Sequence, residues 1–320
     1  MAMTWRWIIM VMALTAATAA AQVYPTRPVR MIVPFAPGGP TDVIGRIVAG
    51  KLSEAFGQQV VVDNRAGAGG NVGTGLAANA TPDGYTLLLV SSSFVVNPGL
   101  YAKIPYDPYK SFAPVSNIAT MPNVYVVHPS VAAKSMQELV KVIQSAPKKY
   151  SFATPGIGTT PDLAAALFKL AMKLDVATIP YNGAGPAIVA VIANQVSLGC
   201  MAMPGVTPHI RGGRLHGLAV TSAARSATLP DLPTMAESGF PGQESDTLQA
   251  LLVPAGTSPA IVQRLHDAVV KIMAQPDVKE RVTSLGYDIL ANSPRELAAQ
   301  IRAEVTKWSK VVKDAGITVE

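Results

Sequence analysis

The sequence has a single cysteine, few charged residues and, beyond its first residues, no long apolar run. Cys200 therefore has no disulfide partner within the chain, and it lies in an apolar stretch, 196–203, that predicts a core strand rather than a reactive thiol. Only 14% of the residues are charged, and the net charge of +6 comes from scattered cations without a Lys/Arg run. These features predict a soluble globular chain that does not bind nucleic acid.

Motifs of the common enzyme classes are also missing. The sequence has no G-x-S-x-G elbow, no H-E-x-x-H and no P-loop, and its four histidines share no metal-ligand spacing. Gly73, Gly75 and Ala78 imitate half of a dinucleotide-binding fingerprint, but no acidic residue stands at a second strand end about twenty residues on. The sequence therefore predicts a protein that is not an enzyme, with no catalytic residues, no metal and no cofactor. A secreted hydrolase that uses the Asp42 carboxylate stays open as the alternative.

The first residues have the three-part form of a secretory signal. Arg6 precedes an apolar run, 8–14, and small residues follow up to Ala19 and Ala21, which are placed for cleavage before Gln22. The apolar run is too short to span a bilayer comfortably, and no cysteine stands at the cleavage point to carry a lipid. We therefore expect 1–21 to be a cleaved signal peptide.

Strands alternate with helices along the rest of the chain, which predicts an α/β fold with largely parallel sheets. Strands are expected at 29–33, 60–63, 85–90, 124–127, 150–153, 176–180, 215–220 and 247–253. A helix is expected from Leu76, and 97–108 is expected to be irregular. The mature chain of roughly 300 residues exceeds what one hydrophobic core usually serves, so two lobes are expected.

The stretch from Val29 to Asp42 is the one around which the chain is organised. A strand runs directly into a loop in which Gly38 and Gly39 lie between prolines, and Thr41 is the expected N-cap of the following helix. Glycine lets the backbone turn its amides toward a guest, and proline fixes the loop before binding. Free amides and the positive end of a helix dipole attract an anion. The loop thus predicts a carboxylate site without a cationic side chain, and Asp42 is expected to brace it through backbone hydrogen bonds.

Similar loops recur later in the chain. They are expected at 154–159 and 181–185, and three serines, 91–93, follow another strand. All of these lie at the carboxyl ends of strands, where α/β sheets bind ligands. Loops of this kind on two lobes would face each other across a cleft that closes on a solute.

A series of short motifs appears in one order along the mature chain. They are VPFAPGG at 33–39 with Asp42, NRAGAGGN at 64–71, PDGYTLL at 82–88, Asn97-Pro98 with Leu100-Tyr101, Tyr181 with Gly183, Pro186 and Ala187, Arg225-Ser226, Leu229-Pro230 with Pro233-Thr234, Glu237, Gly239, and PAGT at 254–257. Each motif is weak alone, but the set in this order is highly specific. Through it the chain, from Tyr24 to its end, resembles the periplasmic solute receptors of tripartite tricarboxylate transporters, the Bug/TctC type.

The resemblance implies a two-lobed periplasmic-binding-protein (Venus-flytrap) fold, each lobe a mostly parallel sheet flanked by helices, with the ligand cleft between the lobes. Lobe 1 is expected at 22–122 and 244–320, and lobe 2 at 123–243, with hinges near 123 and 243. The loops matching 35–42 and 181–187 are expected to hold a small organic carboxylate through backbone groups and bridging waters, without catalysis. The expected ligand-binding residues are Phe35, Ala36, Pro37, Gly38, Gly39, Asp42, Ser92, Ser93, Thr154, Gly158, Thr159, Tyr181, Gly183 and Ala184.

The chain departs from the family pattern at several positions. Asp162 stands where the pattern has His, Ala190 where it has Asp, and Leu248 where it has Trp; Ala193 and Asn194 replace a glycine pair. Loss of an acid that faces the cleft would remove a partner for a ligand amine. We therefore expect an apolar or aromatic acid rather than an aspartate-like ligand.

The resemblance also implies partners. The expected ones are the small organic acid and the membrane permease subunits of a tripartite tricarboxylate transporter, and the protein is expected to be a periplasmic monomer. A receptor that presents its liganded form to a membrane sensor kinase is an alternative that the sequence does not separate from a transport receptor.

Overall fold

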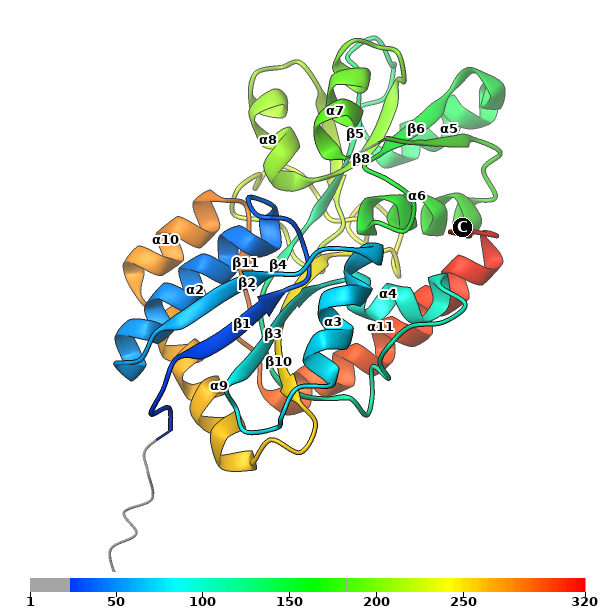
Figure 1. The fold of residues 1–320 in the computed structure, drawn as a ribbon. Coiled ribbons are helices and arrows are strands. Elements are labelled where there is room, and N and C mark those ends of the chain that lie inside the picture. Colours follow the sequence, from blue (N-terminus) through cyan, green and yellow to red (C-terminus); the bar gives the residue numbers. More distant parts are fainter. Residues whose placement is uncertain (1–23, 182, 320) are drawn as a thin grey trace, which may run out of the picture.

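The computed structural model describes residues 24–181 and 183–319, which form two α/β bodies, each a sheet with helices on both faces (Figure 1). The predicted signal peptide, 1–21, lies outside the described residues. Within them, no helix is both long and apolar enough to cross a membrane.

The first body, lobe 1, is built on a six-stranded sheet in the order β11-β4-β10-β3-β1-β2. Its strands are β1 (Val29–Val33), β2 (Val60–Asn64), β3 (Thr86–Ser91), β4 (Phe112–Met121), β10 (Thr247–Pro254) and β11 (Asp288–Ile289). β1 is parallel to β2 and β3, whereas β10 is antiparallel to both β3 and β4.

Helices cover both faces of this sheet. They are α2 (Pro40–Phe56), α3 (Asn71–Ala78), α4 (Ser93–Leu100), α9 (Pro259–Met273), α10 (Pro276–Ser284) and α11 (Pro294–Asp314), with a short 3₁₀ turn at Ala68–Gly70. In β10, Leu251 and Val253 pack with α2, α9 and α10, and Leu252 packs with α4 and α11 on the other face. Because successive side chains of a strand point to opposite faces, a strand covered on both sides needs this continuous apolar sequence.

The second body, lobe 2, has a five-stranded sheet in the order β7-β6-β8-β5-β9. Its strands are β5 (Asn123–Val127), β6 (Ser151–Thr154), β7 (Ala177–Pro180), β8 (Leu198–Ala202) and β9 (His216–Val220). Its helices are α5 (Met136–Ser145), α6 (Thr160–Met172), α7 (Ala184–Ile192) and α8 (Met203–Arg211), with a 3₁₀ turn at Pro147–Lys149. α5 and α6 cover one face, and α7 and α8 cover the other.

The predicted two-lobed α/β architecture is confirmed, but both sheets are mixed rather than mostly parallel. The reason lies in how the chain passes between the sheets. β4 leads directly into β5 with only Pro122 between them, and β10 returns to lobe 1 antiparallel to β4. The chain therefore enters the lobe 2 sheet through β5, which is antiparallel to β8, and returns to the lobe 1 sheet through β10, which is antiparallel to β3.

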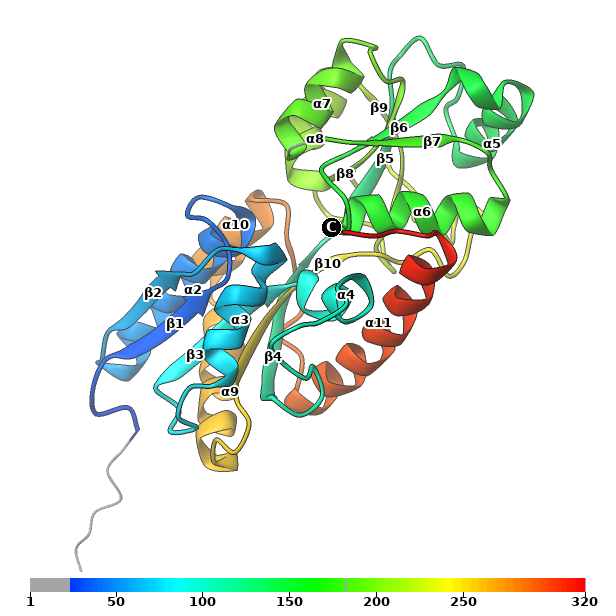
Figure 2. The same cartoon turned by 45° about the vertical axis from the view of Figure 1, so that its right-hand side comes forward.

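The crossing segments are hydrogen-bonded to each other between the two sheets. The Asn123 amide donates to the Thr221 hydroxyl at 2.9 Å, and the Thr221 amide donates to the Asn123 carbonyl at 2.9 Å. The Ser245 amide donates to the Thr221 carbonyl at 3.2 Å. Away from these strands, the end of α11 reaches α6, whose Leu163 packs in the same core cluster as Val312 (Figure 2).

Two sequence expectations about helices were wrong. Residues 93–100 form α4, with Pro98 inside it, although irregular structure was expected from 97. α3 begins at Asn71 rather than at Leu76. Its Gly73 lies close to its neighbours: a Cβ there would lie 2.7 Å from the Arg65 carbonyl oxygen and 2.8 Å from Cβ of Pro34. The half fingerprint at 73–78 is thus explained by packing.

Cys200 lies in β8 and is fully buried, as the prediction of a core strand required. Burial raises the pKa of its thiol, which keeps the thiol protonated and unreactive.

Candidate functional site

The loop after β1 ends in a helix start with unpaired amides. The N-cap of α2 is Gly39 and Pro40 occupies the first helical position, so the expectation that Thr41 is the N-cap was wrong. Proline suits that position because its fixed φ is helical and its missing N–H has no intrahelical partner to lose. The first intrahelical bond joins the Val43 amide to the Gly39 carbonyl at 3.0 Å. The amides of Thr41 and Asp42 lie before it and have no partner within the helix.

Asp42 braces this loop, as the sequence predicted. Its Oδ2 accepts hydrogen bonds from the Gly38 amide at 2.8 Å and from Nε of Arg46 at 2.9 Å, and its Oδ1 accepts from Nδ2 of Asn64 at 2.9 Å. Burial alone would raise the pKa of Asp42, but the hydrogen bonds from Arg46, Gly38 and Asn64 hold it below its usual value. The Arg46 charge also offsets that of Asp42, so the helix start stays attractive to an anion.

Lobe 2 carries a counterpart of this arrangement after β6. Asp162 accepts from the Gly158 amide at 3.0 Å, four residues earlier, just as Asp42 accepts from Gly38. Its other oxygen accepts from the Thr154 hydroxyl at 2.9 Å. Among the described residues the charged neighbour of Asp162 is Lys169 rather than an arginine, and burial raises the pKa of Asp162 despite that charge and these hydrogen bonds. The start of α6 therefore has a buried acid without the paired arginine that Asp42 has.

The start of α7 is a helix N-terminus without an acidic residue. Gly183 is its N-cap, with φ of +110°, and its first turn contains no carboxylate. The loop before it is tied to the β6 loop, because the Tyr181 amide donates to the Thr154 carbonyl at 2.9 Å and the Gly183 amide donates to the Pro155 carbonyl at 2.8 Å. The amides of Ala184 and Gly185 lie in the first turn, where no intrahelical partner exists. Asn182 is not among the described residues.

The predicted site residues fall into one set in each lobe. The lobe 1 set is Phe35, Ala36, Pro37, Gly38, Gly39, Asp42, Ser92 and Ser93, and the lobe 2 set is Thr154, Gly158, Thr159, Tyr181, Gly183 and Ala184. One direct contact near them joins the lobes, where the Thr247 hydroxyl donates to the Thr160 hydroxyl at 2.8 Å.

Three of the predicted hydroxyls already have protein partners. The Ser92 hydroxyl accepts from the Leu248 amide at 3.0 Å and is fixed at the start of β10. The Thr154 hydroxyl donates to Asp162, and the Thr159 hydroxyl donates to the Gly156 carbonyl at 2.7 Å. These groups hold the loops in place. Their predicted contact with a ligand remains a prediction.

A cavity of about 550 Å³ lies under the loop after β1. That is within the usual range for a small-molecule site. It is lined by Phe35, Ala36, Pro37, Gly38, Gly39, Pro40, Thr41, Ser91, Met121, Thr247 and Gln249. No described residue of the β6 or β7 loops lines it.

Sequence reasoning missed three of these lining residues: Met121, Thr247 and Gln249. They come from the end of β4 and the start of β10. The signal available in the sequence was Gln249 itself, a polar residue inside the otherwise apolar strand 248–253.

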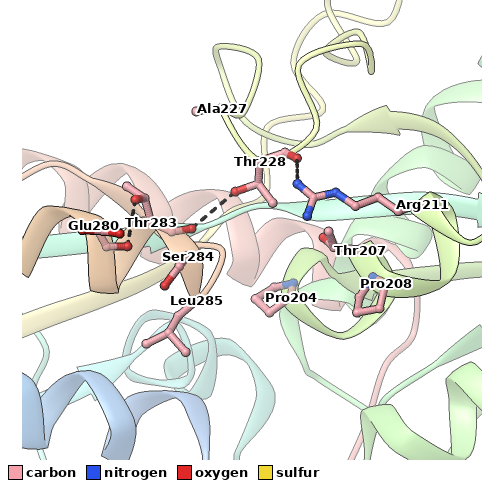
Figure 3. A pocket seen from close by; sticks show the side chains of 10 residues that line it. All are labelled: Pro204, Thr207, Pro208, Arg211, Ala227, Thr228, Glu280, Thr283, Ser284 and Leu285. Carbon is pink, nitrogen blue, oxygen red and sulfur yellow. Dashed lines mark hydrogen bonds between the residues drawn. The ribbon is translucent and has the colours of Figure 1, made fainter.

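A second cavity, of about 580 Å³, lies between α8 and α10 (Figure 3). Arg211 is its one cationic lining residue, and its guanidinium donates to the Thr228 carbonyl at 2.9 Å. Glu280 lines the same cavity and would repel a carboxylate guest. The cavity under the β1 loop has no acidic lining residue and is lined by Thr41 at the start of α2, so it is the better site for an anion.

The described residues show no metal centre or catalytic arrangement. No group of three His, Cys, Asp or Glu residues in the described part of the chain is placed to hold a metal ion. Asp42 is engaged by three donors and has a lowered pKa, which makes it a weak general base. Ala190 is buried in α7 at 2% exposure and does not line the cavity under the β1 loop.

Comparison with protein families gives a match over most of the chain. The model described as Tripartite tricarboxylate transporter family receptor matches residues 44–317. BugT of Bordetella pertussis is 38% identical over 303 residues, which cover 94% of this chain and 93% of that protein. A UPF0065 protein in the tcbD-tcbE intergenic region of Pseudomonas sp. strain P51 is 38% identical over 290 residues, covering 90% of this chain and 86% of that protein.

Solved structures agree with these matches. The periplasmic binding protein BugD has a TM-score of 0.76 at 37% identity, covering 93% of this chain and 100% of that chain. An R. palustris protein with adipate has a TM-score of 0.79 at 33% identity, covering 92% and 99%. MatC from Rhodopseudomonas palustris with bound malate has a TM-score of 0.75 at 31% identity, covering 90% and 100%.

Proposed function

The chain belongs to the tripartite tricarboxylate transporter receptor family, and from that premise we propose that it is a periplasmic receptor for a small organic carboxylate. The ligand is captured between the two lobes and released unchanged. The observation that carries the proposal is the pair of helix starts at α2 and α7, each with free amides after a glycine-containing loop. Relatives solved with adipate and malate support a carboxylate ligand.

We place the ligand carboxylate at the amides of Thr41 and Asp42 on one side and of Ala184 and Gly185 on the other. The two sets lie in different lobes, so both are engaged only when the lobes close. Closure about the segments near 123 and 243, with lobe boundaries at 22–122, 244–320 and 123–243, is part of this proposal. The hydrogen-bonded crossing segments at Asn123, Thr221 and Ser245 support it.

Delivery to a tripartite transporter is the second half of the proposal, with removal of 1–21 on export. A strain that lacks the gene should lose uptake of the radiolabelled ligand. Normal uptake together with loss of a transcriptional response to the ligand would instead support the sensor-kinase alternative.

Ligand binding is tested on protein that has been unfolded and refolded to remove bound solute. Among a panel of carboxylates, at least one should raise the melting temperature, because a ligand present at 100 times its Kd stabilises the folded state by about 2.7 kcal/mol. The neutral methyl ester of the same acid is the control and should have no effect. A panel in which no carboxylate raises the melting temperature would contradict the proposal.

The backbone-amide site is tested by Ala184→Pro. Proline is tolerated at the first position of a helix and removes only that amide's N–H. We expect carboxylate affinity to fall by about ten- to a hundredfold, since one hydrogen bond to a charged group is worth about 1.5–3 kcal/mol and each ~1.4 kcal/mol is tenfold. Ala184→Gly also changes the side chain but keeps the amide N–H, so its affinity should stay close to that of the unaltered protein. Equal affinities for the two variants would rule out this amide.

A further inference from the structure

Gln249 has a buried side chain whose two polar atoms both lack a partner. It is fully buried, and neither its Oε1 nor its Nε2 makes a hydrogen bond within the described chain. Among the described residues, Gln249 is the one whose side-chain amide has both its nitrogen and its oxygen buried without a hydrogen-bond partner. Buried polar groups are nearly always hydrogen-bonded, so each exception needs an explanation.

The position of Gln249 connects this amide to the candidate site. Gln249 is the third residue of β10, opposite Ser91 of β3 and Ala119 of β4. It lines the cavity under the β1 loop together with Ser91, Met121 and Thr247. Along β10, Leu251 and Val253 lie on the same face and are packed in the core of lobe 1. The amide thus stands at the point where an apolar strand face meets the cavity.

Packing does not explain a glutamine at this position. Leucine or methionine would fill a similar volume and would leave no orphaned donor and acceptor. The backbone amide of Gln249 has its own partner, Oδ1 of Asn117 at 3.3 Å, so the side chain is not needed to satisfy it. Retaining both orphaned atoms lowers folding stability unless something in the cavity pairs with them.

We propose that Gln249 is a specificity-determining residue that reads a neutral polar group on the bound carboxylate. Its amide presents a donor and an acceptor, so the complementary group is a hydroxyl or a primary amide, which can accept from Nε2 and donate to Oε1. A second carboxylate would satisfy Nε2 but would bring negative charge against Oε1. The ligand class is therefore a carboxylate that carries a hydroxyl or amide group close to the end held by the β1 loop.

This inference rests on the proposed function and narrows it. The loop amides would bind any carboxylate, whereas a ligand that leaves the Gln249 side-chain amide without a hydrogen-bond partner would bind more weakly. A site built to hydrogen-bond a ligand group discriminates strongly against the analogue that lacks the group. The expected apolar or aromatic acid is thereby restricted to one that also bears such a polar group.

The test uses calorimetric titration of ligand-stripped protein with matched pairs of acids that differ by one hydroxyl, such as malate and succinate, or lactate and propionate. We expect the hydroxylated member of at least one pair to bind at least about tenfold more tightly. Gln249→Leu should bring the two affinities of that pair together. Met121→Leu, which changes the apolar lining of the same cavity, should shift both affinities in parallel and keep their ratio.

Thermal unfolding of the ligand-free variants supplies an independent measurement. Gln249→Leu should melt at a higher temperature than the unaltered protein, because it removes two orphaned polar atoms from a buried site. A lower melting temperature would show that the amide is already satisfied and would overturn the inference. An unchanged hydroxyl preference in Gln249→Leu would overturn it as well, while leaving carboxylate binding intact. Absence of binding for every acid to the unaltered protein would instead refute the proposed function, and this inference with it.

Discussion

At the scale of single residues, two aspartates with the same local geometry differ in charge environment. Asp42 and Asp162 each accept a hydrogen bond from the backbone amide four residues earlier, in the loop before a helix. Arg46 pairs with the first, and the pKa of Asp42 is lowered, whereas burial raises the pKa of Asp162. The same loop brace is thus paired with a cation in lobe 1, whereas in lobe 2 burial is the dominant influence on its pKa.

Asp42→Asn should weaken the β1 loop. Asparagine offers one acceptor and one donor, so its NH₂ group would face either the Gly38 amide or the side chain of Asn64. We expect a loss of about 1–3 kcal/mol in the free energy of unfolding at neutral pH, measured by urea denaturation.

The loss depends on pH with a definite sign. Because the folded-state pKa of Asp42 is below its unfolded value of about 3.9, its stabilisation is complete above that value and disappears as the pH falls through the folded pKa. The gap between the two proteins should therefore close below about pH 4. Asp277→Asn is the control, since Asp277 is 65% exposed and its pairing with Lys51 is screened by water. A gap that widens in acid would contradict the assigned role of Asp42.

At the scale of helices and strands, the sequence predicted the elements whose signals are local. The strand–loop unit at 29–39 could be read from adjacent residues, and it is present. The antiparallel insertion of β10 between β3 and β4 could not, because residues far apart in the chain decide it. The cavity-lining Met121 was missed for the same reason, whereas Gln249 had a local signal as a polar residue inside an apolar strand.

Gly73 also shows how a local motif misleads. In the sequence it matched part of a nucleotide-binding fingerprint, but in the fold it lets α3 approach Pro34 and the Arg65 carbonyl. The glycine pattern alone does not distinguish a phosphate site from a close contact between backbones. Only the tertiary neighbours decide between them.

Gly73→Ala should displace α3 relative to Pro34, the first residue of the loop after β1. An added Cβ would lie 2.7–2.9 Å from backbone and ring atoms of Arg65 and Pro34 that cannot rotate away. We expect a loss of about 1–3 kcal/mol in unfolding free energy, together with weaker carboxylate binding, measured by chemical denaturation and titration.

Gly50→Ala is the matched control for this substitution. Gly50 lies inside α2, and an added Cβ there meets no atom within 4 Å. Alanine should stabilise the helix by about 0.5–1 kcal/mol and leave binding unchanged. If Gly73→Ala behaved like Gly50→Ala, the packing explanation for α3 would be wrong.

At the scale of the whole molecule, an acid sits where the two lobes join. Asp246 precedes β10, and its Oδ1 accepts from the Thr221 hydroxyl at 3.1 Å. Burial is the main cause that raises the pKa of Asp246 to about 7; the Thr221 hydrogen bond opposes it, Asp288 and Glu304 add to it, and Lys307 opposes it. The junction is therefore sensitive to pH near neutrality.

Asp246→Asn should change the pH profile of stability. Because the folded-state pKa is raised, the contribution of Asp246 is fully present below the unfolded pKa of about 3.9 and is lost as the pH rises to about 7. Relative to the variant, the unaltered protein should lose stability across this window and no further above it. Thermal unfolding at one-unit pH intervals measures the difference, and parallel profiles for the two proteins would contradict the assignment.

The place of β10 between β3 and β4 also determines when the sheet of each lobe can be completed during synthesis. The second sheet is encoded in one continuous stretch, 123–220, whereas the first lacks an inner strand until residues 247–254 leave the ribosome. Until then β3 and β4 of the nascent chain have unpaired edges, which can pair with other incompletely folded chains. A chain truncated before residue 247 would therefore contain all strands of the lobe 2 sheet but would lack β10, an inner strand of the lobe 1 sheet.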